Sequence, residues 1–279
     1  MTIKKRLVGG NPHNTQWHPL QLQRKVKSAQ THNNDRFKSY YHEDRFNKYI
    51  KHKEVLAESK ILIDVDELSL ISEQINQRKW QKLIDPPQVV GYTMMREFYA
   101  NAWVTESEKH LPLTYTSFIR RKDISFTLEV IHKVLSLRNS PLNNVASYHD
   151  RKNANDLRPD DILRDLCIPG ARWVTYDNGK PHFLRRTDLQ NMARGWSEVN
   201  TERAMLVHSI IIGEDIQVDE IIANQIYKFT KKTDRRAKLP FPGIVKCLCN
   251  RAKASAPDDT LIPVEGPIDG KMMMRVRGT

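Results

Sequence analysis

The sequence predicts a mainly α-helical fold, a multi-helix domain with one or two short β-hairpins. Over most of the chain, apolar residues recur at spacings of three and four, which is the period of an amphipathic helix. Prolines and glycines end these stretches at defined points, as Pro86-Pro87 does after a predicted helix at 69–83. Two short segments, 114–126 and 173–184, have instead the runs and turn residues of β-hairpins. The helical domain is predicted to cover residues 33–255.

The chain on either side of this domain is expected to be loosely held. Residues 1–32 are polar and basic, contain Gly9-Gly10, and offer few apolar side chains for packing, so they predict a mobile basic N-terminal arm. After Ala256 the helical periodicity is lost. Residues 256–279 are therefore expected to form a loose C-terminal tail.

The domain opens with an aromatic helix that starts near Asn34. Lys and Arg fill the positions between its apolar residues, a pattern typical of nucleic-acid-binding surfaces. The alternative is an amphipathic helix whose aromatic face packs on the core, and this is the interpretation we favour. The residues concerned are Phe37, Tyr40, Tyr41, Phe46, Tyr49, Ile50 and Leu56.

Further helices are predicted at 69–83, 89–104 and 127–137, after a short extended or turn segment at 61–65. The helix 89–104 is apolar on more than one face, so it should be central in the domain. Its apolar residues are Met94, Met95, Phe98, Tyr99, Ala102 and Trp103.

The second half of the chain is punctuated by proline, asparagine and glycine. Pro159-Asp160-Asp161 starts a short helix that ends near Cys167. Asp177-Asn178-Gly179 joins the two strands of the second hairpin. The remaining predictions are a helix from Thr187 to Trp196, a helix capped by Asn200, its antiparallel partner 218–229 across Gly213, and a last helix opened by Pro240 and Pro242.

Positive charge is concentrated at the two ends of the chain. The net charge is +12; residues 1–60 hold thirteen Lys and Arg against five Asp and Glu, and residues 228–279 hold twelve against five. Such ends suit phosphate backbones or acidic surfaces, although both could equally be ordinary solvated surface. The candidate nucleic-acid-binding residues are Lys4, Lys5, Arg6, Arg24, Lys25, Lys27, Lys231, Lys232, Arg235 and Arg236.

Composition points to a soluble intracellular protein, in the nucleus or the cytoplasm. Hydrophobic residues make up 39% of the chain and charged residues 28%, which is the globular range. The longest apolar stretch, 204–212, is far shorter than the roughly 20 residues that cross a bilayer. The three cysteines are too few and too clustered for a disulfide framework. The candidate partners are RNA or DNA and further copies of the chain, with no membrane partner.

The common catalytic patterns are not found, so we expect neither an enzyme nor a cofactor. Cys247 and Cys249 lack the second ligand pair of a zinc site and are expected to be buried helix cysteines. His208 lies in an apolar helix and is expected to be a hydrogen-bonded core residue. Asp64 and Asp66 alternate with apolar residues and, with Asp160, Asp161 and Asp165, are the only candidates for metal-dependent nuclease chemistry, but helix caps and turns explain them better.

Several stretches together resemble the plant transposon protein domain, a family found in plant open reading frames linked to retroelements. The resemblance extends over about residues 33–255. It lies in MMREFYANAW (94–103), FIRRKDISF (118–126), IPGARW (168–173), ERAMLVHSIIIGEDIQVDEIIANQIYKF (202–229) and KLPFPGIVKCLCNRA (238–252). These motifs are apolar and structural, so the resemblance implies an origin and transfers no catalytic residue.

The chain departs from the family pattern at two points. The family usually has a longer connection after the tryptophan that matches Trp196, whereas Ser197–Thr201 bridges directly here. Where the family tends to have Arg-Gly in its β segment, this chain has Arg120-Arg121. The first departure looks like a deletion or an altered splice, and it raises the alternative of a relic gene whose helices pack imperfectly.

Three functions are compatible with these observations. The first is a non-enzymatic, plant transposable-element-derived protein that binds nucleic acid, in the manner of a coat protein. The second is a helical protein-interaction module whose basic charge is incidental. The third is a metal-dependent transposase or nuclease, which would require Asp64.

Overall fold

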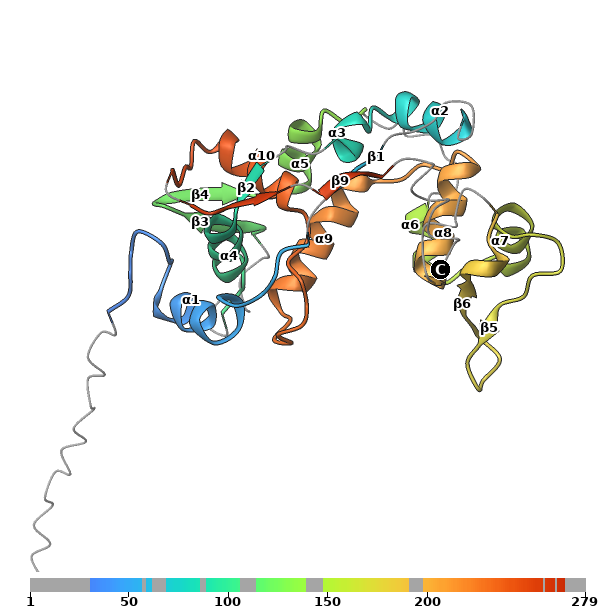
Figure 1. The fold of residues 1–279 in the computed structure, drawn as a ribbon, viewed down its shortest axis with the longest axis horizontal. Helices are drawn as coiled ribbons and strands as arrows, with labels where there is room; N and C mark the ends of the chain where they lie inside the picture. The colour runs from blue at the N-terminus through green and yellow to red at the C-terminus, as the bar shows by residue number, and fades with distance from the viewer. Residues whose placement is uncertain are drawn as a thin grey trace, which may run out of the picture. The chain divides into compact units, whose positions relative to one another are not determined.

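The computed structural model describes residues 31–56, 59–61, 69–85, 89–105, 114–138, 148–190, 198–257, 259–263 and 265–268 (Figure 1). The chain divides into two units between Thr31 and His32, and every described helix and strand belongs to the second unit. The arm predicted at 1–32 lies almost wholly outside the described residues. So do Asp64 and Asp66, and the segment 191–197.

The described chain is mainly helical, as predicted, but it contains more strands than two hairpins. The α-helices are α1 (Tyr40–Arg45), α2 (Ser69–Arg78), α3 (Gln81–Ile84), α4 (Tyr92–Asn101), α5 (Leu128–Leu135), α6 (Tyr148–Asn153), α7 (Pro159–Leu166), α8 (Thr201–Ile211), α9 (Val218–Thr230) and α10 (Pro242–Arg251). A π-helix, η1 (Phe46–Ile50), continues α1, and a 3-10 turn, η3 (Arg186–Asp188), comes after the second hairpin.

The strands form small sheets. They are β1 (Ser59–Ile61), β2 (Val89–Gly91), β3 (Thr116–Ile119), β4 (Lys122–Ser125), β5 (Val174–Thr175), β6 (Pro181–Arg185), β7 (Glu198–Asn200), β8 (Leu261–Pro263) and β9 (Glu265–Ile268). β3 pairs with β4, and β5, β6 and β7 form an antiparallel sheet in that order. β2 pairs with β8 in an antiparallel pair, and β1 with β9 in a parallel one.

The first of two hydrophobic cores surrounds α4. This helix contacts α1, η1, β2, β3, α9 and α10, and Met95, Phe98 and Tyr99 are completely buried. Phe37, Phe46 and Ile50 also lie in this core. The prediction that α4 is central is therefore confirmed, and the packing of the aromatic helix on the core is confirmed for these three residues.

The second core is built mainly from α2, α7, α8 and the three-stranded sheet. Ile162, Leu184, Val199 and Ala204 are completely buried in it. Trp80, between α2 and α3, joins the same core.

The two cores draw on alternating stretches of the chain. The first takes residues from 37–55, 94–135 and 222–262, while the second takes them from 75–80 and 148–216. Leu83, Leu137 and Val218 pack against both. Neither core is therefore formed by one continuous segment.

Three predicted helices differ from those observed. Lys79 has a φ of 57°, which cannot continue a right-handed helix, so the predicted helix 69–83 is divided into α2 and α3. Val89 to Gly91 form β2 instead of the first turn of α4. Of the helix predicted from Thr187 to Trp196, residues 191–196 lie outside the described residues; within 187–190, Thr187 lies in the 3-10 turn η3 and Leu189 forms an antiparallel bridge with Cys167.

The predicted antiparallel hairpin of α8 and α9 is wrong. Both helices and the turn at Gly213 (φ 76°) are present. However, α8 packs against α2, α6, α7 and β6 in the second core, whereas α9 packs against α4 and α5 in the first. Helical periodicity located the two apolar stripes, but it could not show that they belong to different cores.

The expectation of a loose tail is wrong for residues 259–263 and 265–268. Residues Leu261–Pro263 pair with β2. The Asp259 carboxylate accepts hydrogen bonds from the backbone N–H groups of Thr93 (2.9 Å) and Met94 (2.8 Å), and so caps the start of α4. Three- and four-residue strands and a single carboxylate carry no helical period, so the sequence pattern did not reveal them.

The turn of the β3–β4 hairpin shows why glycine suits the position of the second departure from the family pattern. Arg120 and Arg121 both have positive φ, 47° and 63°, a conformation that favours glycine in two-residue hairpin turns. Arg121 also pairs with Asp35 (2.5 Å), but both side chains are largely exposed, so the pair contributes little.

We expect Arg121→Gly to raise the free energy of unfolding by about 0.5–1 kcal/mol, because glycine removes the left-handed strain. Arg121→Ala is the control, since it removes the same side chain but keeps the Cβ atom. Urea denaturation of both variants tests this expectation, and equal stabilities would contradict it.

Candidate nucleic-acid interface

The dense basic run at the end of α9 forms an exposed loop, residues 231–238, which we call the basic loop. Lys231, Lys232, Arg235 and Arg236 are all exposed. None of these four has an acidic ion-pair partner among the described residues. Four cations are thus available to a negatively charged ligand.

Two buried cations hold the backbone of the basic loop. The Arg45 guanidinium donates a hydrogen bond to the carbonyl of Thr230, and the Lys53 ammonium donates to the carbonyls of Asp234 and Ala237. Both side chains are almost fully buried. Burial lowers the pKa of Arg45 to about 10 and lowers the pKa of Lys53. Both cations contact carbonyl groups at or just after the C-terminal end of α9. The dipole of a helix favours positive charge at that end.

The far end of the loop is joined to the segment after η1. Val55 and Leu239 form a parallel bridge, with Leu56 N–H donating to Leu239 O and Leu239 N–H donating to Glu54 O, both at 2.8 Å. Arg96 of α4 donates to the carbonyl of Lys53 at 3.0 Å. The loop is therefore fixed at both ends to the first core.

Inside the loop, short contacts set the positions of the lysines. Asp234 Oδ1 accepts from the N–H of Arg236 at 2.9 Å and so closes the turn. The Lys231 ammonium lies 4.1 Å from the centre of the Tyr227 ring, and the Lys232 ammonium lies 4.2 Å from that of Phe229. These cation–π contacts orient both lysines and leave their charge without a counter-ion.

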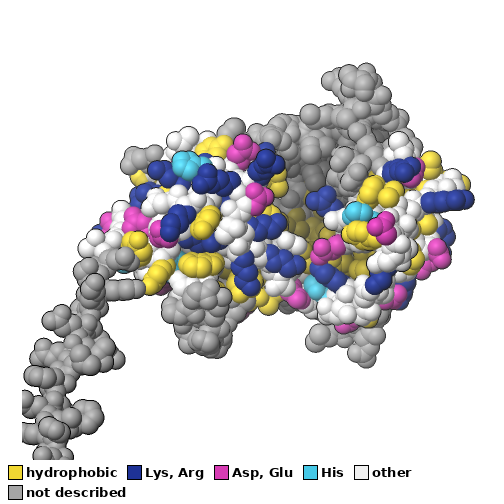
Figure 2. All heavy atoms as spheres, turned by 90° about the horizontal axis from the view of Figure 1, so that it is seen from below, with side chains coloured by type: hydrophobic (Ala, Val, Ile, Leu, Met, Phe, Trp, Pro, Cys, Tyr) yellow, Lys and Arg dark blue, Asp and Glu magenta, His cyan; other side chains and the backbone are white. Residues whose placement is uncertain are grey.

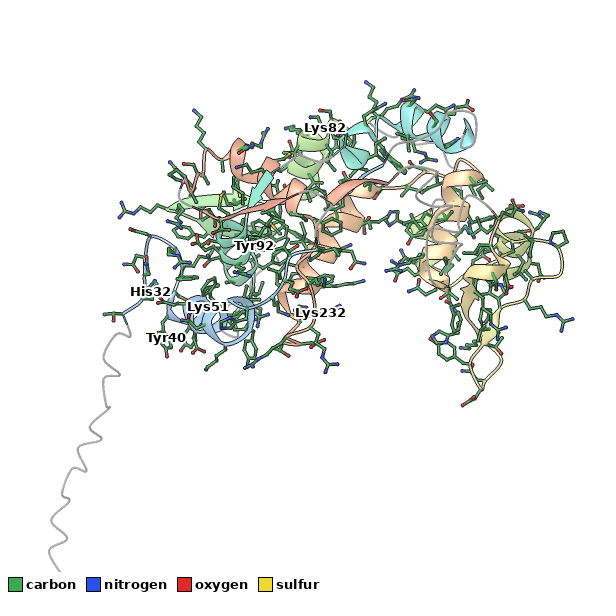
Figure 3. The ribbon with its side chains drawn as sticks, viewed as in Figure 1. His32, Tyr40, Lys51, Lys82, Tyr92 and Lys232 are labelled. Carbon is green, nitrogen blue, oxygen red and sulfur yellow. The ribbon has the colours of Figure 1, made fainter. Side chains whose placement is uncertain are left out.

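Further positive charge comes from η1 and the residues after it. Lys51 is exposed, whereas Lys48 pairs with Asp44 at 2.7 Å. Figure 3 labels Lys51 beside α1 and Lys232 at the end of α9. Figure 2 is viewed from the side on which α1 and the end of α9 lie in Figure 1, and it shows many Lys and Arg side chains on this face. Asp and Glu side chains also lie on this face (Figure 2), so the exposed cations of the basic loop and Lys51 are the groups that would attract an anionic partner.

The structure brings together four of the ten predicted site residues. Lys231, Lys232, Arg235 and Arg236 share one loop. Lys4, Lys5, Arg6, Arg24, Lys25 and Lys27 lie outside the described residues. The sequence analysis missed Arg45 and Lys53, since their partners are 185 and 181 residues away and no local pattern indicates such contacts.

Two of the carboxylates considered for metal binding form ion pairs with an arginine. Asp161 and Asp165 pair with Arg164 at 2.8 and 2.9 Å. Asp160 stands in the first turn of α7, the position expected for it. No group of three or more His, Cys, Asp or Glu that could hold a metal ion occurs among the residues the structure describes.

The cysteines lie where reactivity is low. Cys167 and Cys249 are buried and Cys247 is half-buried. Burial raises the pKa of Cys167 to about 11 and that of Cys249 to about 12, so both remain thiols at neutral pH.

A buried polar cluster in the second core explains His208. His208 Nε2 contacts Asp165 Oδ2 at 3.0 Å, and the pKa of His208 is lowered by burial. Next to it, Arg151 Nη1 donates to both carboxylate oxygens of Glu214 at 3.0 and 2.8 Å, and Ser209 Oγ donates to Glu214 at 2.6 Å. His208 is thus a hydrogen-bonded core residue, as predicted, in a network that joins α6, α7 and α8.

Comparison with known proteins identifies the family. The family described as "Putative plant retrotransposon-related domain" matches residues 76–255. The chain belongs to this family. The resemblance inferred from the sequence motifs is thereby confirmed. None of the curated proteins and none of the solved structures matches the chain.

In this plant retrotransposon-related domain, the described part of the short connection, residues 198–201, is part of the fold. Glu198–Asn200 form β7, which pairs with β6. Asn200 Oδ1 accepts from the N–H of Arg203 at 2.9 Å, so Asn200 caps α8 as predicted. Ala204 and Met205, one turn later, are buried in the second core. The first turn of α8 is therefore capped and packed on the second core.

No helix among the described residues of this retrotransposon-related chain is both long and apolar enough to span a membrane.

Proposed function

We propose that this plant retrotransposon-related protein is a non-enzymatic nucleic-acid-binding protein that coats its ligand by contacting phosphates. The observation that carries the proposal is the basic loop. Its four exposed cations have no acidic partner among the described residues, and its backbone is fixed from beneath by Arg45 and Lys53.

A fixed loop is a better phosphate ligand than a mobile one. Ordering a flexible loop on binding costs free energy, and a loop already held at Thr230, Asp234 and Leu239 avoids much of that cost. Each phosphate contacted by a lysine or arginine also releases condensed counter-ions, which makes affinity depend steeply on salt.

Fluorescence anisotropy of labelled RNA and DNA with the full-length protein, titrated at two salt concentrations, tests the proposal. We expect a log–log slope of about −0.7 per phosphate contact for single strands and about −0.9 for duplexes. Replacing Lys231, Lys232, Arg235 and Arg236 by glutamine should weaken binding and make the slope shallower by about that amount for each phosphate that the variant no longer engages.

The matched control neutralises the same number of exposed cations elsewhere: Arg172, Lys180, Arg185 and Arg203. This control should retain most of the affinity, because the basic loop is intact. Deletion of residues 1–32 measures the contribution of the N-terminal segment separately. Equal losses in the loop variant and the control would indicate a diffuse charge effect without a defined surface. Absence of binding at low salt would favour the protein-interaction alternative.

A further inference from the structure

We propose that this surface selects single-stranded over duplex nucleic acid, with Tyr41 and Tyr49 stacking on unpaired bases. The inference rests on the proposed function and adds to it the form of the ligand. It is carried by two exposed aromatic rings, four residues before and four residues after Arg45, the residue that holds the start of the basic loop.

The two rings flank the residue that fixes the start of the loop. Tyr41, Arg45 and Tyr49 are spaced by four residues along α1 and η1, so their side chains lie on one side of the helix. Arg45 Cζ lies 5.7 Å from the centre of the Tyr49 ring, while its Nη2 donates to Thr230, the last residue of α9. Tyr49 is therefore linked through Arg45 to the start of the basic loop, and Tyr41 lies one helical turn before Arg45.

Neither ring is needed to fill the core. Tyr41 is 61% exposed and Tyr49 is 37% exposed, whereas Phe37 and Phe46 of the same segment are buried. Neither tyrosine hydroxyl makes a hydrogen bond to another of the described residues. The Tyr41 and Tyr40 rings form a T-shaped pair with centres 6.0 Å apart, so Tyr40 does not stack flat on Tyr41.

Exposed rings next to exposed cations match the chemistry of a single strand. Lys51 directly follows the helical segment that carries the rings, and Figure 3 shows Tyr40, Lys51 and Lys232 on this part of the molecule. Cations alone bind duplex and single strand alike through phosphate. Aromatic faces add affinity only for bases whose own faces are free, which in a duplex are covered by neighbouring bases.

Anisotropy titrations with oligouridine, oligothymidine and a DNA duplex, at one salt concentration, test the inference. Tyr41→Leu/Tyr49→Leu should weaken binding of both single strands by about tenfold and leave duplex binding unchanged. Tyr41→Phe/Tyr49→Phe should retain single-strand affinity, because phenylalanine keeps the ring. Tyr176→Leu, a control at a tyrosine that is 51% exposed on the β5–β6 hairpin, should bind as the parent does.

The possible outcomes separate this inference from the proposed function. If the leucine variant binds single strands as tightly as the parent, or loses duplex and single strand equally, the stacking inference is overturned while salt-dependent binding stands. If the parent protein binds none of the three probes at low salt, both are overturned. Weaker binding of both single strands with duplex binding unchanged supports the inference, whether the parent protein prefers oligouridine or oligothymidine.

Discussion

Replacing Glu214 by alanine is expected to lower the free energy of unfolding by about 3–5 kcal/mol, the cost of leaving a buried charge without its partner. The Arg151 side chain is 1% exposed and that of Glu214 is 8% exposed. Arg151 Nε already has no hydrogen-bond partner, so the guanidinium depends on Glu214 for most of its compensation. Urea denaturation monitored by two independent probes measures the loss and checks for a single transition.

Two controls define what this loss means. Glu202→Ala removes the acidic partner of Lys152, but both side chains of that pair are well exposed, so the expected loss is below about 1 kcal/mol. Arg151→Met/Glu214→Leu removes both buried charges and should be much less destabilising than Glu214→Ala alone. If Glu214→Ala lowers the free energy of unfolding no more than Glu202→Ala does, the buried Arg151–Glu214 pair does not stabilise the second core.

Substitution of Gly91 by alanine is expected to destabilise the protein by about 1–3 kcal/mol, because it displaces the cap of α4. A Cβ atom at Gly91 would lie 2.1 Å from Asp259 Oδ2 and 2.7 Å from Asp259 Cγ. The carboxylate must then move away from the N–H groups of Thr93 and Met94. The backbone at Gly91 has φ −81°, which alanine adopts without strain, so the steric conflict with Asp259 is the whole cause.

The effect of this substitution should change sign once the carboxylate is removed. Asp259→Ala alone should cost about 1–2 kcal/mol through loss of the cap. In that background the Gly91→Ala substitution meets no carboxylate and should stabilise the protein by about 0.4–1 kcal/mol, because alanine has less freedom in the unfolded chain. Additive losses in the double-mutant cycle would mean that Gly91 and Asp259 do not interact in this way.

Local features of the fold were accessible from the sequence because they depend on neighbouring residues. The cap at Asn200, the hairpin turn after Tyr176, the start of α7 at Pro159 and the central α4 all arise from short-range patterns. The division of α2 from α3 at Lys79 was not accessible, since lysine gives no turn signal. Assignment of α8 and α9 to different cores depends on tertiary packing, which periodicity does not encode.

The candidate site was predictable only in its exposed part. Lys231, Lys232, Arg235 and Arg236 form a visible charge run. Arg45 and Lys53, which hold the same loop, look like ordinary members of a basic helix, and only the structure shows that they are buried against carbonyls. A run of charged residues in a sequence therefore indicates where cations are available to a ligand. It does not indicate which buried residues hold the backbone of that run in place.

The alternation of the two cores along the chain has a consequence during synthesis. The last buried residue of the second core is Ile216, whereas the first core still needs Ile222 to Ile262 when Ile216 leaves the ribosome. Met95, Phe98 and Tyr99 emerge early and must wait for α9, α10 and β8 before they are covered. Until residues 222–262 have been made, the apolar side chains of the first core are incompletely covered. At this stage of synthesis the nascent chain is therefore prone to aggregation and dependent on chaperones. A chain cut short between these two points would contain the buried residues of the second core but lack those that cover Met95, Phe98 and Tyr99 in the first.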